Sequence, residues 1–197
     1  MTLKSLSAEQ ISENWDKFCA WLDKTGERAD ACKALAMHFG ERLAMCPASS
    51  KLKYHNAFAG GLIDHSLRVL KNAVLLKKTF NWDVSNESLI ICSLFHDIGK
   101  VGDLEKDYYV EQTSDWHRDK NGEIFTFNEN ISYMETPDRS VWLLQQFGVK
   151  LSRDEWLAIK LNDGYVYEPN RKYCMREGVL AHIIMTADYI STMQEKM

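Results

Sequence analysis

The sequence predicts an all-α protein, a bundle of helices with one small inserted β-hairpin. Apolar residues recur at three- and four-residue spacing along most of the chain, which is the helical period. One stretch, about residues 107–128, is instead rich in aromatic residues on both sides of Asn121-Gly122, the strongest short hairpin signal. With 197 residues, 45% of them hydrophobic, the chain is long enough for a substantial core, so we expect a single domain over 1–197.

Caps and breakers set the limits of the expected helices. The first, about 8–24, begins after Ser7, and the second, about 27–45, is stopped by Pro47. Further helices are expected over about 61–80, from Ser85 to about 98 where Gly99 and Gly102 end it, over about 137–147, from the capping box at Ser152, and over about 175–195. Residues 1–47 would then form N-terminal helices beside a core made by residues 48–192.

Composition excludes several classes of protein. The formal net charge of −4 argues against a broad basic surface, so we expect no long nucleic acid as a partner. The five cysteines form no C-x-x-C pair and are odd in number, which suits reduced thiols in a cytosolic protein. The first residues lack an apolar signal core, and no apolar run approaches the roughly 18 residues that a membrane helix needs. We therefore expect a cytoplasmic protein with no membrane partner.

Four potential metal ligands lie on three of the expected helices: His65, the adjacent His96 and Asp97, and Asp188. Both His65 and Asp188 have apolar neighbours three and four residues away, so each lies at the edge of an apolar stripe. A carboxylate there is costly unless it is paired or binds a metal. His96 and Asp97 come at the last turn of their helix, where imidazole and carboxylate can converge on one point. Such a mixed nitrogen and oxygen site suits Mn²⁺, Fe²⁺, Co²⁺, Ni²⁺, Zn²⁺ or Mg²⁺.

Three runs of sequence carry a family resemblance: "YHNAFAGGLIDHSLRVL" (54–70), "LFHDIGKVGD" (94–103) and "IIMTADYIST" (183–192). Together they resemble the HD superfamily of metal-dependent phosphohydrolases, whose ligands come in the order H, HD, D. The resemblance covers roughly residues 48–192 and implies an HD-type helical bundle with His65, His96, Asp97 and Asp188 as ligands. Taken one at a time, each of these residues is better explained as an ordinary packed polar side chain, whereas the four in family order favour a metal site.

The chain also resembles small single-domain HD proteins of bacteria and their phages. Several relatives in the broader superfamily have histidines near Pro137-Asp138 and Asn162-Asp163 that hold a second metal, and this chain has neither. The expected cofactor is therefore one divalent metal ion.

The acid–base groups are less clearly marked than the ligands. HD nucleotidases commonly carry a glutamate three residues after the HD aspartate, where this chain has Lys100. Lysine is a poor base at neutral pH and is better suited to neutralising phosphate charge, although Lys100 could equally be a solvated residue after a helix. The proton-transfer role is open between Asp163, His117 and His55. His55 could instead bond the backbone ahead of the Gly60-Gly61 turn.

Three more residues are candidates for binding substrate. Trp116 and Arg118 adjoin the expected hairpin tip, where they could stack on a base and bind phosphate, or could simply pack and solvate the hairpin. Arg139 begins a helix, where the dipole does not favour positive charge, so we expect it to contact an anion.

The expected function is that of a metal-dependent phosphohydrolase acting on a nucleotide or short oligonucleotide, with metal-activated water attacking phosphorus. Its partner would be a small phosphorylated substrate. The alternative is a non-catalytic module of the same fold that binds metal or nucleotide in a regulatory or interaction role. A purely structural metal is a third possibility.

Overall fold

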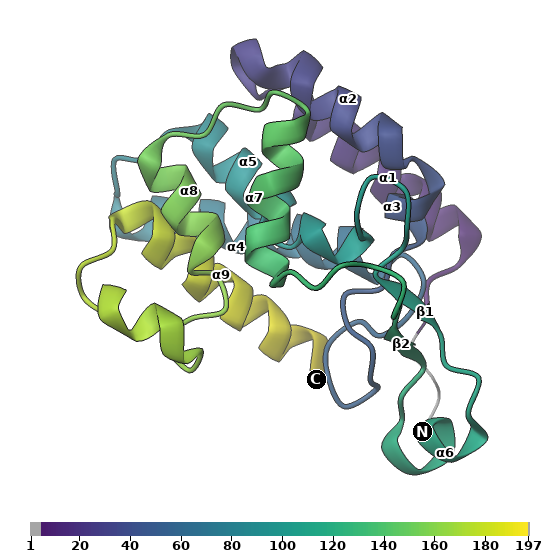
Figure 1. Ribbon diagram of the computed structural model, residues 1–197. Coiled ribbons are helices and arrows are strands. Elements are labelled where there is room, and N and C mark those ends of the chain that lie inside the picture. Colours follow the sequence, from purple (N-terminus) through teal and green to yellow (C-terminus); the bar gives the residue numbers. More distant parts are fainter. Residues whose placement is uncertain (1–4, 197) are drawn as a thin grey trace.

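Helices dominate residues 5–196, the part of the chain that the computed structural model describes (Figure 1), and the expected all-α class is confirmed. The α-helices are α1 (Ala8–Leu22), α2 (Ala29–Phe39), α3 (Glu41–Met45), α4 (Gly61–Phe80), α5 (Asn86–Phe95), α6 (Asp115–Asn121), α7 (Thr136–Gln146), α8 (Arg153–Lys160) and α9 (Val179–Lys196). Short 3-10 turns lie at η1 (Gly26–Arg28), η2 (Ile98–Val101) and η3 (Glu168–Tyr173). Residues 1–4 and 197, the ends of the single domain expected over 1–197, lie outside this part, and the division at 47 stays a prediction.

Helix α4 is the central element of the bundle. It packs most extensively against α9 and α5, while α1 and α3 also contact it. Its buried residues Leu62, Val69 and Ala73 recur at helical spacing and contribute to one hydrophobic cluster with residues of α1, α5, α8 and α9. This packing brings the N-terminal part of α4, which carries His65, close to α9 and to the end of α5, the three places where ligands are expected.

Most expected helix limits match the structure, and the exceptions have local causes. The expected 27–45 helix is broken at Gly40, whose φ of +47° is a left-handed conformation that ends α2 before α3 begins. The helix after Ser85 ends at Phe95, earlier than expected, with His96 as its cap and Asp97 leading into η2. The last helix starts at Val179, later than expected. The chain before it forms the η3 turn, and Met175 at φ +60° is not in a right-handed helical conformation.

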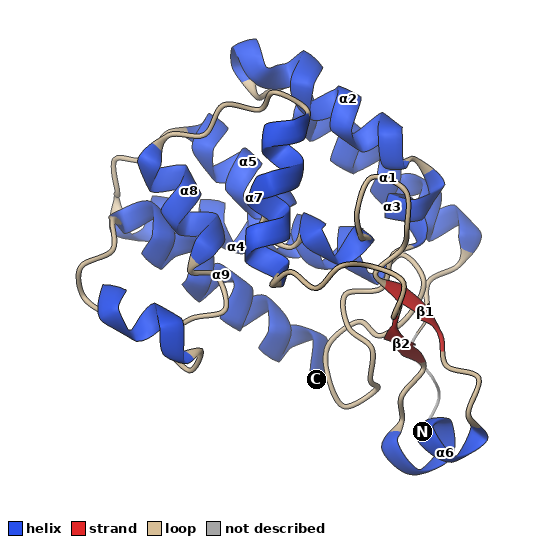
Figure 2. Cartoon of the chain, in the orientation of Figure 1, coloured by secondary structure: helices blue, strands red, loops and turns tan. Residues whose placement is uncertain are grey.

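The inserted hairpin is confirmed, but the expected tight turn is wrong. Strands β1 (Tyr109–Glu111) and β2 (Phe125–Phe127) pair antiparallel, with Tyr109 opposite Phe127. Helix α6 lies between them, and Gly122 at φ +59° ends that helix by donating its N–H to the Arg118 carbonyl. A left-handed glycine ends a helix as readily as it completes a two-residue turn. Asn121-Gly122 therefore marks the end of a helix here, and not the tight turn that its sequence predicted. Figure 2 shows these strands at one edge of the helical body.

The loop between α3 and α4 runs beside the hairpin. The Leu52 N–H donates to the Gly122 carbonyl at 2.8 Å, and the Ile124 N–H donates to the Ser50 carbonyl at 2.9 Å. These bonds hold residues 50–52 against the base of α6, only a few residues from His55. Among residues 5–196, no helix is both long enough and apolar enough to cross a membrane.

Candidate metal centre

The four predicted ligands come together between α4, α5 and α9. His65 projects from α4, His96 caps α5, Asp97 leads into η2, and Asp188 projects from α9. The His65 Nε2 atom lies 3.0 Å from Asp188 Oδ1 and 3.3 Å from His96 Nε2. The His96 Nε2 atom in turn lies 3.5 Å from Asp97 Oδ2. Two imidazole nitrogens and two carboxylates therefore face one small volume, which is a suitable donor set for a divalent metal ion.

The outer nitrogens of both imidazoles are held by the surrounding protein. His65 Nδ1 lies 3.1 Å from each carboxylate oxygen of Glu195, and His96 Nδ1 lies 2.9 Å from the Ser93 carbonyl oxygen. Because both partners only accept hydrogen bonds, each Nδ1 donates and each Nε2 faces the centre. This arrangement orients metal-binding histidines in proteins.

Glu195 was not predicted from the sequence. It lies seven residues after Asp188, two turns further along the same face of α9, and its side chain is buried. This seven-residue spacing could have indicated Glu195 from the sequence. A carboxylate two turns from a predicted ligand lies on the same face of the helix, where it needs a partner.

Neighbouring charges fix the ionisation of the carboxylates. Burial alone would raise the pKa of Asp97, but the Lys100 ammonium, 2.5 Å from Asp97 Oδ2, and the nearby imidazoles hold it well below its ordinary range. Burial would likewise raise the pKa of Asp188, and its bond to His65 lowers it. Both carboxylates are therefore ionised at neutral pH.

The same pairing fixes the charge of Lys100. Burial would lower its pKa, but the Asp97 carboxylate outweighs burial and raises that pKa above its ordinary value. Lys100 is consequently an ammonium at neutral pH, which suits charge neutralisation and rules out service as a base in this state.

The two imidazoles respond in opposite directions in the metal-free protein. Burial lowers the pKa of His96, whereas bonds to Asp188 and Glu195 overcome burial and raise the pKa of His65 to about 9. A metal ion bound at His65 therefore has to displace a proton from this ring.

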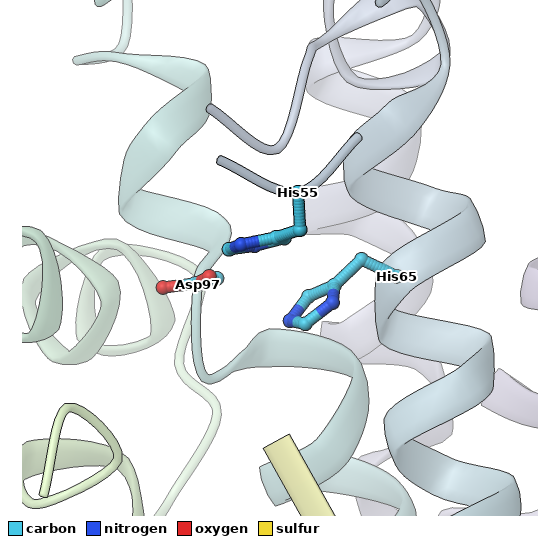
Figure 3. Close-up of side chains that lie close together, drawn as sticks. All are labelled: His55, His65 and Asp97. Atoms are coloured by element: carbon cyan, nitrogen blue, oxygen red, sulfur yellow. The ribbon is translucent and has the colours of Figure 1, made fainter. Parts of the chain in front are cut away.

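His55 reaches the same cluster from the α3–α4 loop. Its ring centroid lies 4.6 Å from that of His65, and ligand atoms of His55, His65 and Asp97 all lie within 4.8 Å of one another (Figure 3). Burial, followed by the Lys100 charge, lowers the pKa of His55 to about 3, so this imidazole is neutral. Its Nε2 atom is buried and has no hydrogen-bond partner among the described residues.

That orphaned nitrogen is the test of whether a metal fits here. A buried nitrogen without a partner is costly in a protein interior, and it faces a cluster of ionised carboxylates and imidazoles. An ion bound by the cluster would remove that cost. The residues present therefore fit a divalent metal.

The segment after α8 contacts the cluster at Asp97. The Asn162 side-chain amide donates to Asp97 Oδ1 at 3.4 Å. Next to it, desolvation and then the Asp97 and Asp188 charges raise the pKa of the Asp163 carboxyl group to about 6. Asp163 thus lies within electrostatic reach of two predicted ligands and can exchange a proton near neutral pH.

A cavity of about 450 Å³ adjoins Lys100 on the side of the hairpin. Its lining combines charged groups at α3 with the aromatic rings of Tyr109 and Phe125. Lys100 thus lies between Asp97 on one side and this cavity on the other.

The structure does not bring the candidates on α6 to the cluster. His117 Nδ1 lies 2.9 Å from the Ser114 hydroxyl oxygen, Arg118 donates to the Gln112 carbonyl at 3.1 Å, and Trp116 is 60% exposed. Helix α6 extends away from the bundle (Figure 1). Among the hydrogen bonds and ion pairs of residues 5–196, none links these three side chains to the ligands. Their catalytic and substrate-binding roles stay predictions.

Arg139 is buried and engaged by the main chain. Its guanidinium donates to the carbonyls of Gly99 at 3.0 Å and Met134 at 2.9 Å, and stacks 4.4 Å from the centre of the Tyr108 ring. It thereby ties α7 to the η2 turn that follows the HD pair. The anion contact expected of Arg139 stays a prediction.

A family model described as the HD domain matches residues 62–193 of the chain, a span that contains all four predicted ligands. The chain belongs to the HD domain family. HD domain proteins are generally metal-dependent phosphohydrolases, and the arrangement of His and Asp residues in this member could hold the metal. No curated protein and no solved structure gave a significant match. His55 and Glu195 both lie outside the matched span.

Proposed function

We propose that this HD domain protein is a phosphohydrolase that acts on a nucleotide or short oligonucleotide, using one divalent metal ion. The observation that carries the proposal is the convergence of His65, His96, Asp97 and Asp188 beside the protonated Lys100. A divalent ion bound by these residues would polarise a phosphoryl oxygen and activate water for attack on phosphorus.

Lys100 supplies a fixed positive charge at the entrance from the cavity. Its ammonium, already ion-paired with Asp97, would offset the negative charge that develops on phosphate oxygens in the transition state. A phosphate bound here would be a second anionic partner of Lys100, beside the Asp97 carboxylate. The adjoining cavity of about 450 Å³ has room for the organic part of a substrate.

Of the three proton-transfer candidates, we favour Asp163 because of its pKa. A pKa of about 6 leaves it mostly ionised at neutral pH, so it can accept the proton of an attacking water. His55 is neutral and lies in the cluster, but its nitrogen faces the ligands. His117 is on α6 and would need a large movement to take part.

The test is release of phosphate and nucleoside from a panel of nucleoside mono- and triphosphates, cyclic nucleotides and short oligonucleotides. Each substrate is incubated with Mn²⁺, Fe²⁺, Co²⁺, Ni²⁺, Zn²⁺ or Mg²⁺ and analysed by chromatography. We expect release by the wild type and none by Asp97→Asn, with the exposed Asp83→Asn as the matched control. Full activity of Asp97→Asn would contradict the proposal. Metal binding without release from any substrate would favour the alternative, a non-catalytic binding module.

A further inference from the structure

His55 is a metal-binding type of side chain that the H, HD, D order does not include. It lies on a loop upstream of residues 62–193. Its ring nevertheless contacts that of His65 at an interplanar angle of 37°, and its Nε2 atom is buried without a hydrogen-bond partner among the described residues. Figure 3 shows His55, His65 and Asp97 arranged around a common space.

The loop is built so that His55 points inward. The next residue, Asn56, is buried at φ +43°, a left-handed conformation that is uncommon outside glycine. Its side-chain amide donates to Asp64 Oδ2 at 2.9 Å and to the Gly61 carbonyl at 3.3 Å. The Asn56 carbonyl in turn accepts the N–H of Ala48 at 3.1 Å. Three hydrogen bonds thus hold a strained residue directly beside His55, an arrangement that is common at functional sites.

We propose that His55 is a fifth ligand of the metal ion, through its Nε2 atom. The proposal rests on the metal centre of the proposed function. His65 belongs both to the group with His55 and Asp97 and to the group with His96 and Asp188. Since Glu195 holds His65 Nδ1, only Nε2 remains for a metal, and one nitrogen lone pair binds one ion. Both groups therefore describe a single position.

The donor set then consists of three imidazoles and two carboxylates. Magnesium prefers oxygen ligands and keeps several waters, whereas imidazole suits manganese, iron, cobalt, nickel and zinc. His55 consequently selects a transition metal over magnesium.

The experiment compares the full chain with two His55 variants. His55→Phe keeps a ring that can pack against His65 but has no nitrogen, and His55→Gln keeps a polar side chain without an imidazole. The matched control is His182→Gln, which removes a half-exposed histidine on α9 that pairs with Glu177. Circular dichroism of the metal-free proteins checks that each variant folds.

Affinities for Mn²⁺, Co²⁺ and Mg²⁺ are measured by titration calorimetry without substrate. Loss of an outer-shell partner of a metal ligand typically costs about 10- to 100-fold in affinity, so removal of a ligand should weaken Mn²⁺ and Co²⁺ binding at least about 10-fold. The affinity for Mg²⁺ should change less. The visible absorption of the Co²⁺ protein should also intensify in the variants, because it grows as the coordination number falls.

Equal transition-metal affinities and spectra in wild type and variants would overturn the proposal, even if activity were lost, and would return His55 to the proton-transfer candidates. X-ray absorption of the Co²⁺-loaded wild type gives an independent answer if neither variant folds: three coordinated imidazoles support the proposal, and two overturn it. None of these readouts uses a substrate, so absence of phosphate release would contradict the proposed function and leave this inference standing.

Discussion

Glu195 receives the Nδ1 hydrogen of His65 between its two carboxylate oxygens, each 3.1 Å from that nitrogen. The pair is buried, and the Arg68 Nε atom lies 3.2 Å from Glu195 Oε1, which balances the carboxylate charge. Because His65 comes from α4 and Glu195 from the end of α9, this contact also fixes how the two central helices meet. The inner nitrogen of His65 is left to face the metal centre.

Substitution of Glu195 should therefore weaken metal binding without removing a ligand. We expect Glu195→Gln, which keeps an acceptor but loses the charge, to lower Mn²⁺ affinity about 10-fold, and Glu195→Ala to lower it further. Titration calorimetry checks this, with the exposed Glu105→Gln as control. Unchanged affinity in a folded Glu195→Ala protein would mean that the carboxylate does not support His65.

Metal binding should raise the unfolding temperature, because the ligands converge only in the folded chain. At a free metal concentration of 100 times Kd, the added stability is about 2.7 kcal/mol, or roughly 5–10 °C for a chain of this size. Differential scanning calorimetry with Mn²⁺ and then a chelator measures the gain and its reversal. Asp97→Asn should show little of this gain; an equal rise in that variant would place the ion elsewhere.

Gly61 should tolerate no side chain. A Cβ atom there would lie 2.2 Å from the Asn56 carbonyl oxygen, which is main chain and cannot move without displacing the loop that carries His55. We expect Gly61→Ala to lower the free energy of unfolding by about 2–4 kcal/mol, as steric strain in a packed region does. At Gly178 the nearest atom to such a Cβ is 3.8 Å away, so Gly178→Ala should change stability by less than about 0.5 kcal/mol. Urea unfolding of both variants makes the comparison, and similar losses would refute the steric argument.

Glu155 should make stability depend on acid pH. Burial raises its pKa, but two guanidinium bonds from Arg28, at 2.8 and 2.9 Å, and the Ser152 N–H lower it below its ordinary value of 4.5. A depressed folded pKa contributes stability above pH 4.5, and that contribution is lost as pH falls through the folded value.

Glu155→Gln should remove this contribution and cost about 3 kcal/mol at pH 7, since it leaves Arg28 without its main partner. The measurement is the unfolding free energy between pH 3 and pH 7. We expect the wild type to lose more stability than the variant on acidification; parallel curves would show that Glu155 is not the group responsible. Glu123→Gln, at the base of α6, serves as the control.

Local signals in the sequence were sufficient for much of the fold. Ser152 and Glu155 form the expected capping box, and the apolar stripe of α4 is buried as its spacing predicts. Helix breaks at Gly40 and after Phe95 were harder to place, because both a continuous and a broken helix satisfy the same apolar spacing. The prediction of a tight turn at Asn121-Gly122 was wrong, because a left-handed glycine can end a helix as well as complete a two-residue turn.

Tertiary contacts determine the parts of the site that single residues do not reveal. The resemblance to the HD family placed His65, His96, Asp97 and Asp188, and the structure brings all four together. The only signal for Glu195 was its seven-residue spacing from Asp188, and it is weak, because a glutamate near a helix end is usually solvated. Arg139 was considered from the helix dipole alone, whereas its side chain contacts carbonyls at Gly99 and Met134 that only the packed α7 and η2 bring within reach.

Main-chain bonds join residues 50–52 to the flanks of α6. They divide the insertion into a part that should tolerate modification and a part that should not. The Ser50 carbonyl accepts the N–H groups of Ile124 and Phe125 at 2.9 and 3.1 Å, so the start of β2 is bonded directly to the loop that bears His55. Within residues 5–196, the exposed Lys120 side chain of α6 makes no hydrogen bond or ion pair. We therefore expect that a fluorophore or affinity tag attached at Lys120 leaves the metal centre undisturbed. Inserting or deleting a residue at Glu123, by contrast, should displace the loop that carries His55, about seventy residues earlier in the sequence.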